Sequence, residues 1–128
     1  MMRRRLLQIP LTEDLYPIGT DIVRKYIREG PNPFVKGTFS AGEAVIDESY
    51  STYISITYIP IDMNYTYQKN GERIMICCYD ENYNYLNYVN YNNLNEQTLT
   101  GWDANTKYIR IKAGNPHSRD YCAITRIV

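Results

Sequence analysis

The order of apolar and polar residues predicts β-strands throughout the chain after residue 33. The range 107–112 is the clearest example, because Ile109 and Ile111 alternate with Tyr108 and Arg110. Alternation at every second residue places the two sets on opposite faces of a strand. We therefore expect Ile109 and Ile111 to face a core, and Tyr108 and Arg110 to face outward.

Residues 50–61 show the same period and predict a second strand, and residues 121–128 predict the last one. In the range 50–61 the apolar side chains should share one face and the hydroxyl side chains the other: Ile54, Ile56 and Tyr58 against Ser55 and Thr57. Pro60 has no amide hydrogen, so the strand should bend or end there.

The strongest turn signal is Asn70-Gly71, a pair favoured in two-residue hairpins. It separates residues 65–69 from residues 73–79, and we expect these two strands to form a hairpin. The second strand is apolar on both faces, which is typical of the middle of a sandwich. A turn at residues 80–82 should then lead into a strand at 83–91.

The first 31 residues have a different character. Thr20 or Asp21 is a candidate cap for one short helix, which Gly30-Pro31 should end. Its apolar face would consist of Ile22, Val23, Tyr26 and Ile27. A segment this short can hardly build its own core, so its apolar residues must pack on the rest of the chain or on another subunit.

Many short strands with almost no helix predict an all-β fold, an antiparallel β-sandwich or jelly roll. We expect an extended N-terminal arm with one short helix at residues 1–31, followed by the sandwich at residues 32–128. A chain of 128 residues is the size of one domain.

Composition narrows the function classes. Fourteen Lys and Arg balance fourteen Asp and Glu, so the chain lacks the basic excess expected of a nucleic-acid binder. No apolar run approaches the roughly 20 residues that span a bilayer. Gln8 and Pro10 interrupt the stretch that a secretion signal would need. Adjacent Cys77 and Cys78 would make a poor disulfide, which favours free thiols and folding in a reducing cytoplasm.

Residues suited to catalysis are few. His117 lies in a predicted polar turn, where an exposed loop histidine is expected. Ligand spacings typical of zinc sites do not occur, so we expect neither a metal nor a cofactor. The acidic residues at 47–48, 80–81 and 103 are scattered, and such residues more often form turns than a catalytic pair.

Fourteen tyrosines make a contact surface the sharper hypothesis. Sugars stack C–H faces on aromatic rings and pair their hydroxyls with amides and carboxylates. Residues that combine the two kinds of group are candidates for glycan or partner contact: Tyr83, Asn84, Tyr85, Tyr88, Tyr91, Trp102 and Asp103. Trp102 is expected either as an exposed platform or as a plug at one end of the sandwich. The tyrosine-rich stretch is expected either as a contact surface or as an ordinary strand with a wet face.

Four segments occur in an order that resembles a known family. They are Asn32-Pro33-Phe34, Tyr58-Ile59-Pro60-Ile61, the stretch ICCYDENYNY at 76–85 and the stretch NTKYIRI at 105–111. Together they resemble the β-sandwich modules of tailed-bacteriophage virion proteins, especially tail-fibre and baseplate appendages. The resemblance covers residues 32–112. It implies a sandwich shaped like a carbohydrate-binding module and, for some such modules, binding of host-surface glycans.

The chain departs from tail fibres because it has no repeats, coiled-coil heptads or collagen-like stretch. We therefore expect a non-enzymatic structural protein of a tailed-phage virion, assembled in the host cytoplasm and displayed as a decoration or adaptor subunit with weak glycan binding. Its expected partners are other capsid or tail subunits and further copies of itself, without nucleic acid or membrane.

The arm is expected to anchor this subunit, through Arg3, Arg4, Arg5, Leu6, Leu7 and Ile9. Two alternatives remain open. One is a receptor-binding module of a tail fibre or baseplate that recognises host glycans during attachment. The other is a glycan-cleaving enzyme on the same sandwich.

Overall fold

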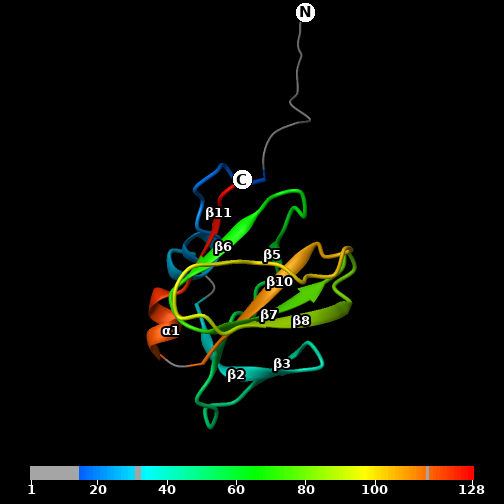
Figure 1. Cartoon of the computed structure of the whole chain (residues 1–128). Coiled ribbons are helices and arrows are strands. Elements are labelled where there is room, and N and C mark those ends of the chain that lie inside the picture. The colour runs from blue at the N-terminus through cyan, green and yellow to red at the C-terminus, as the bar shows by residue number, and fades with distance from the viewer. Residues whose placement is uncertain (1–14, 31–32, 115) are drawn as a thin grey trace, which may run out of the picture.

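The computed structural model describes residues 15–30, 33–114 and 116–128. These residues form ten strands and two short helices (Figure 1). In chain order the elements are η1 Arg24–Arg28, β2 Val35–Ser40, β3 Glu43–Ile46, β4 Tyr53–Ile54, β5 Ile59–Pro60, β6 Tyr67–Asn70, β7 Ile74–Tyr79, β8 Tyr85–Tyr91, β9 Gln97–Thr98, β10 Tyr108–Ala113, α1 Pro116–Tyr121 and β11 Ala123–Arg126. Neither helix is long and apolar enough to cross a membrane within this part of the chain.

The strands form two antiparallel sheets. The larger has seven strands in the order β3-β2-β4-β10-β7-β8, with β5 also pairing with β10. The smaller has three strands in the order β11-β6-β9. The predicted all-β antiparallel sandwich is therefore confirmed.

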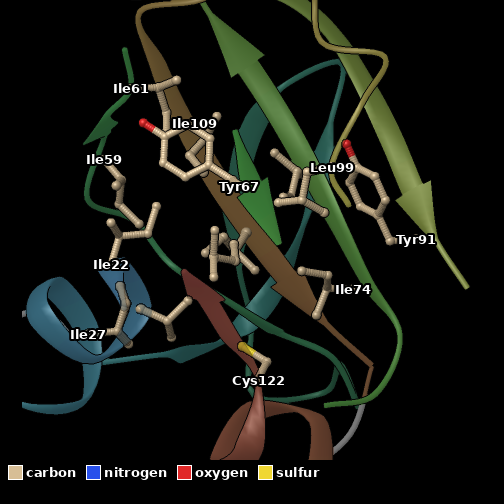
Figure 2. Packing of buried hydrophobic residues seen from close by; sticks show 14 of the residues in the cluster. Ile22, Ile27, Ile59, Ile61, Tyr67, Ile74, Tyr91, Leu99, Ile109 and Cys122 are labelled. Carbon is tan, nitrogen blue, oxygen red and sulfur yellow. The ribbon is translucent and has the colours of Figure 1, made fainter. Parts of the chain in front are cut away.

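The core draws on both sheets (Figure 2). Ile109 and Ile111 of β10 are fully buried there, as their alternation predicted. The strand β7 is buried on both faces, also as predicted, since Ile76 and Cys78 lie in the core and Cys77 and Tyr79 are buried on the opposite face. Fully burying one such aliphatic side chain contributes about 1.5–3 kcal/mol.

The segment 15–30 belongs to this core rather than to a separate arm. Four of its side chains are buried in the same cluster: Tyr16, Ile22, Val23 and Ile27. The predicted boundary at residue 31 would cut through this cluster, so we place residues 15–30 with the sandwich. Residues 1–14, which hold the predicted anchor residues, lie outside the described residues.

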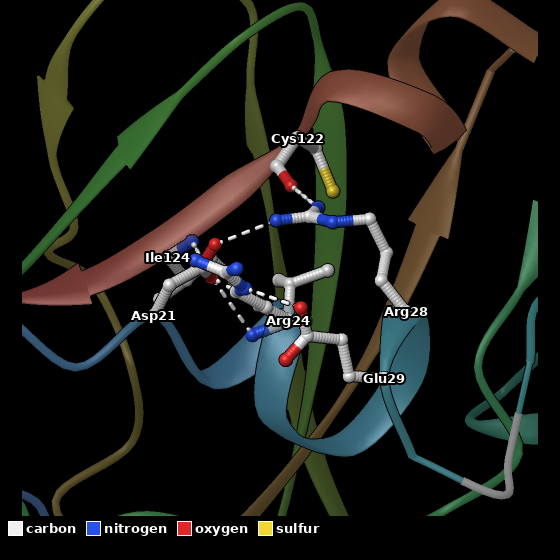
Figure 3. A network of polar contacts seen from close by, with 7 residues as sticks. Asp21, Arg24, Arg28, Glu29, Cys122 and Ile124 are labelled. Carbon is white, nitrogen blue, oxygen red and sulfur yellow. Dashed lines mark hydrogen bonds and ion pairs between the residues drawn. The ribbon is translucent and has the colours of Figure 1, made fainter.

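Asp21 fastens this segment to β11 (Figure 3). Its Oδ1 accepts hydrogen bonds from the amides of Val23 and Arg24, which is the predicted helix cap, and from the amide of Ile124. Its Oδ2 lies 2.7 Å from Nη2 of Arg28, whose Nη1 donates to the carbonyl of Cys122. One carboxylate therefore caps a helix and joins it to the last strand.

The predicted single strand at 50–61 is wrong. The chain forms two short strands, β4 and β5, which pair with opposite ends of β10. Regular pairing stops after β4. Ser55 is buried, its amide still donates to the carbonyl of Ile111 and its Oγ accepts from the amide of Ile111, whereas Ile56 is exposed. The face assignment fails because alternation holds only while a strand is regular.

The predicted hairpin at Asn70-Gly71 is also wrong. The two strands exist, but β6 belongs to the small sheet and β7 to the large one. Both edges of β7 are already occupied by β10 and β8, so the turn joins two layers instead of two neighbours. A two-residue hairpin does occur between β2 and β3, where Ala41 and Gly42 have φ angles of +47° and +79°.

Two smaller expectations also change. His117 lies in α1 and not in a polar turn. Arg110 does point away from the core, but it is only 6% exposed, because the β2–β3 hairpin covers it. The turn after β7 and the strand β8 follow the prediction.

Candidate functional site

The outer face of the large sheet carries a cleft that we call the tyrosine cleft. It lies between the β2–β3 hairpin and the strands β7, β8 and β10. In Figure 1 these three strands lie above the hairpin. It consists of two hollows of about 300 and 380 Å³ that share Ala41, Gly42 and Tyr85. The first is also lined by Glu43, Ala44, Tyr58, Tyr79, Tyr83, Asn84 and Arg110, and the second by Phe39, Met75, Cys77, Tyr88, Asn90 and Lys112.

Strand register explains why these side chains meet. Arg110 of β10 pairs with Cys77 of β7, which pairs with Tyr88 of β8. Directly paired residues project to the same face of a sheet. Each strand therefore contributes every second side chain to the floor of the cleft, while the intervening residues fill the core.

At one end of the cleft the tyrosine rings form a cluster. Tyr58 lies 5.0 Å from Tyr79 and 4.7 Å from Tyr83, measured between ring centroids. Tyr83 stacks on Tyr108 at 4.8 Å with an interplanar angle of 30°. Offset and edge-to-face contacts of this kind favour fixed ring positions. The cluster therefore presents preformed aromatic faces.

Asp80 builds the loop that presents Tyr83. Its Oδ1 accepts from the amides of Asn82 and Asn84, and its Oδ2 accepts from the side-chain amide of Asn84. These hydrogen bonds, first that from the Asn84 amide, lower the pKa of Asp80 below its ordinary value. Tyr83 itself has a φ of +66°, a conformation that costs a non-glycine residue about 1–3 kcal/mol. The loop holds an exposed ring in a strained position at the rim.

Gly42 allows the hairpin to approach the sheet. A Cβ at this position would lie 2.4 Å from the ring of Tyr85, so only glycine fits. The carbonyl of Gly42 accepts from the hydroxyl of Tyr79 at 2.6 Å and from Nη2 of Arg110 at 3.0 Å. The turn is thus fixed over the floor of the cleft.

Arg110 is the buried cation of the cleft. Its Nε donates to the hydroxyl of Tyr79 at 3.1 Å, and its Nη1 donates to the carbonyl of Ile56 at 3.3 Å. Its guanidinium carbon lies 4.2 Å from the ring centroid of Tyr58 and 4.8 Å from that of Tyr79, distances at which a cation is attracted to the ring face.

Three tyrosine hydroxyls in and beside the cleft are held in the neutral form at physiological pH. Burial raises the pKa of Tyr79 and of Tyr85, and hydrogen bonding with Tyr83 raises that of Tyr108. Burial likewise raises the pKa of the Cys77 thiol. The charged groups that line the cleft are therefore Arg110, Lys112 and Glu43.

The structure brings together four of the seven predicted contact residues. Tyr83, Asn84 and Tyr85 line the first hollow, and Tyr85 and Tyr88 line the second. Tyr91 was expected on the same surface but is buried in the core, 2% exposed, where its hydroxyl donates to the carbonyl of Thr100. The reason is the alternation of β8, which turns Tyr91 to the face opposite Tyr88.

Trp102 and Asp103 lie outside the tyrosine cleft. The Trp102 ring packs on the core cluster, 5.6 Å from the ring of Tyr67, which corresponds to the plug rather than the exposed platform. A small hollow of about 130 Å³ lies beside it. Asp103 forms a turn, since its Oδ1 accepts from the amide of Asn105 and its carbonyl accepts from Thr106.

Sequence reasoning missed Tyr58, Tyr79 and Arg110 as site residues. The alternation in 107–112 gave the correct face for Arg110, but nothing in that stretch reveals that a distant hairpin covers this face. Tyr58 was assigned to a face shared with Ile54 and Ile56, which the broken strand does not have.

Three of the acidic candidates for catalysis have structural partners. Asp80 and Asp103 hold turns, and Oδ1 of Asp47 accepts from the amide of Ser49. Glu43 is the acidic residue that lines the tyrosine cleft. Within the described ranges no group of three His, Cys, Asp or Glu side chains is arranged to hold a metal ion.

Comparison of this chain with protein families, with curated proteins and with solved structures finds no match. Function is therefore inferred from the tyrosine cleft and from the sequence resemblance.

Proposed function

We propose that this protein is a non-enzymatic binding module that holds a sugar in the tyrosine cleft. The observation that carries the proposal is the pair of exposed rings at its rim. Tyr83 is 51% exposed and Tyr88 is 54% exposed, and each lines one of the two adjoining hollows. Exposed aromatic faces beside polar groups suit the C–H faces and hydroxyls of a sugar.

The size and stiffness of the cleft support this proposal. Its hollows are at the lower end of the volumes found for small-molecule sites. The Tyr83 ring is fixed by stacking on Tyr108, and the hairpin is fixed by the hydrogen bond from Arg110 to the carbonyl of Gly42. A preformed site loses little conformational entropy when the ligand binds.

The proposal also places this module on the particle of a tailed bacteriophage, as a decoration, adaptor or receptor-binding subunit. The resemblance of residues 32–112 to virion sandwich modules supports this part. Its test is the copy number of the protein in purified particles, with a chain that lacks residues 1–14 as the matched variant. All core residues in the described part of the chain, from Tyr16 onward, are kept in this variant, so the deletion should preserve folding and reduce incorporation. Full incorporation of the shortened chain would contradict an anchoring role for the arm.

Sugar binding is tested with a glycan array and titration calorimetry on the full chain. Tyr83→Ala and Tyr88→Ala should each weaken binding about tenfold, the loss expected for one stacked ring. Tyr121→Ala is the matched control, since this tyrosine is 65% exposed on α1 and does not line the cleft.

Three outcomes would contradict this assignment. The first is the absence of saturable binding to any sugar of the array. The second is equal loss in Tyr121→Ala, which would mean that the contact is not located in the cleft. The third is loss in Trp102→Ala alone, which would place the site beside the small sheet.

A further inference from the structure

We propose that the sugar held in the tyrosine cleft carries a carboxylate and that Arg110 recognises it. This inference rests on the proposed function and adds the chemical class of its ligand. It is built on the hydrogen bonds of Arg110, its charge, and the groups that surround it.

The hydrogen bonds of Arg110 leave two donors. A guanidinium has five N–H groups. Within the described residues three of them are used, toward the hydroxyl of Tyr79 and the carbonyls of Ile56 and Gly42. Each terminal nitrogen makes one of these bonds and so keeps one N–H. Two N–H groups are the number that a bidentate carboxylate accepts.

The charge of Arg110 has no counter-ion in the described part of the chain. No Asp or Glu oxygen there lies within 4.0 Å of its nitrogens, although the residue is 6% exposed. A buried charge without an ionic partner is costly, and a ligand carboxylate would supply that partner. The residue lines the first hollow, so a ligand there reaches it.

The surroundings favour an anion. Lys112 lines the second hollow, where its Nζ lies 3.4 Å from Oγ1 of Thr38. Glu43 is the acidic group of the lining, and burial raises the pKa of Tyr79 and of Tyr85, which keeps these two hydroxyls uncharged. The lining of the two hollows therefore contains two positively charged side chains and one negatively charged side chain. The flat guanidinium also matches a planar carboxylate better than an ammonium does.

A purely structural Arg110 would behave differently. Its three hydrogen bonds also hold the hairpin over the sheet, and in that role alone it would not distinguish an acidic sugar from its neutral counterpart. The decisive comparison is therefore between two ligands on the wild-type chain, and not between the wild type and a variant that loses the hairpin.

The experiment is calorimetry of the full chain with oligogalacturonate and with the same oligosaccharide as its methyl ester. A third arm uses oligosialic acid, which separates a uronate from a sialate as the source of the carboxylate. We expect at least one acidic ligand to bind about tenfold more tightly than the neutral ester, as fits a charge-assisted bidentate contact. This preference should shrink as salt concentration rises.

Three variants locate the carboxylate. Arg110→Lys keeps the positive charge but removes the planar pair of terminal nitrogens, and should lose most of the preference for the acid. Lys112→Gln removes the neighbouring charge and leaves the three hydrogen bonds of Arg110 to the hydroxyl of Tyr79 and to two carbonyls in place, and should lose little of the preference. Glu43→Gln removes the repelling carboxylate, and should strengthen binding of the acid but not of the ester.

The possible results distinguish the proposed sugar site from the inference that Arg110 recognises a carboxylate. Binding of the ester and both acids with equal affinity would overturn the inference and leave the proposed sugar site standing. Lack of binding to any sugar, neutral or acidic, would overturn both. A preference lost in Lys112→Gln and kept in Arg110→Lys would show that Arg110 is not the recognising residue. If Arg110→Lys fails to fold, the ester comparison and Glu43→Gln still decide the question.

Discussion

Lys69 offers the sharpest test of how this sandwich is held together. It lies in β6 with its side chain fully buried, and its ammonium donates to four backbone carbonyls. Two of these belong to the turn between β6 and β7, at Gly71 and Glu72, and two belong to the loop after β8, at Asn93 and Asn95. One side chain therefore joins two loops that are far apart in the sequence.

The expected cost of Lys69→Met follows from these contacts. Burial lowers the pKa of the Lys69 amine, whereas the carbonyl oxygens stabilise its charged form. Three ammonium hydrogens form three full bonds, and leaving each acceptor without a donor costs about 1–2 kcal/mol. Met packs in the same place as the apolar part of the lysine side chain and carries no charge to bury. The loss for each carbonyl should therefore be at the lower end of this range. We expect a loss of about 3 kcal/mol, or about 10 °C in Tm.

The assay is urea denaturation, followed by circular dichroism and by the fluorescence of Trp102. The matched control is Lys107→Met, because Lys107 is exposed and the same substitution there should change stability by less than about 0.5 kcal/mol. A Lys69→Met chain as stable as the wild type would refute this reasoning. It would mean that burying the ammonium costs as much as its hydrogen bonds contribute.

Three further predictions follow from the fold. Gly42→Ala should destabilise the protein and abolish sugar binding, whereas Gly19→Ala, with a similar positive φ but no atom within 4 Å, should cost only about 1 kcal/mol in denaturant titrations. Deleting residues 1–30 should prevent folding, because four core side chains are lost, while deleting residues 1–14 should leave the circular dichroism spectrum unchanged. Burial raises the pKa of the Cys122 thiol to about 12, so this thiol ionises at lower pH in the unfolded chain than in the folded one. The free energy of unfolding should therefore fall above pH 9, by about 1.4 kcal/mol per pH unit for this thiol. Cys122→Ala should reduce that slope in urea titrations at about pH 8–11.

The sequence predicted those parts of the fold that depend on local patterns. Ile109 and Ile111 alternate because β10 is regular over its whole length, and Asp21 caps a helix through bonds to its own neighbours. Such contacts lie within a few residues, so the sequence order contains them.

The predictions that proved wrong concern features that depend on contacts between distant segments. Asn70-Gly71 does turn the chain, but the partner of each strand is decided by which sheet has a free edge. Ile56 is exposed because two short strands pair with opposite ends of β10, a fact that residues 50–61 do not record. Local propensity gives the elements, and competition among all strands gives their pairing.

The tyrosine cleft likewise combines residues that a local pattern predicts with residues that only contacts between distant segments bring in. Tyr83, Asn84 and Tyr85 are neighbours in sequence, so their combination of aromatic and amide side chains is visible there. Arg110 joins them only because the β2–β3 hairpin bends over the outer face and Gly42 lets it approach. A cleft assembled from five strands cannot be recognised in the sequence of any one of them.

This origin of the cleft divides its residues into two groups with different uses. Arg110 and Tyr79 on the floor of the cleft are hydrogen-bonded to Gly42 of the hairpin above it, so any change in these floor residues alters the position of the hairpin together with the site. The rings of Tyr83 and Tyr88 project from the rim and are more than half exposed, so their removal should change binding with little effect on unfolding. Affinity that follows the rim variants while stability follows the floor variants would distinguish a binding site from a merely well-packed sheet surface. Affinity and stability that decline together in both groups would favour the packed surface.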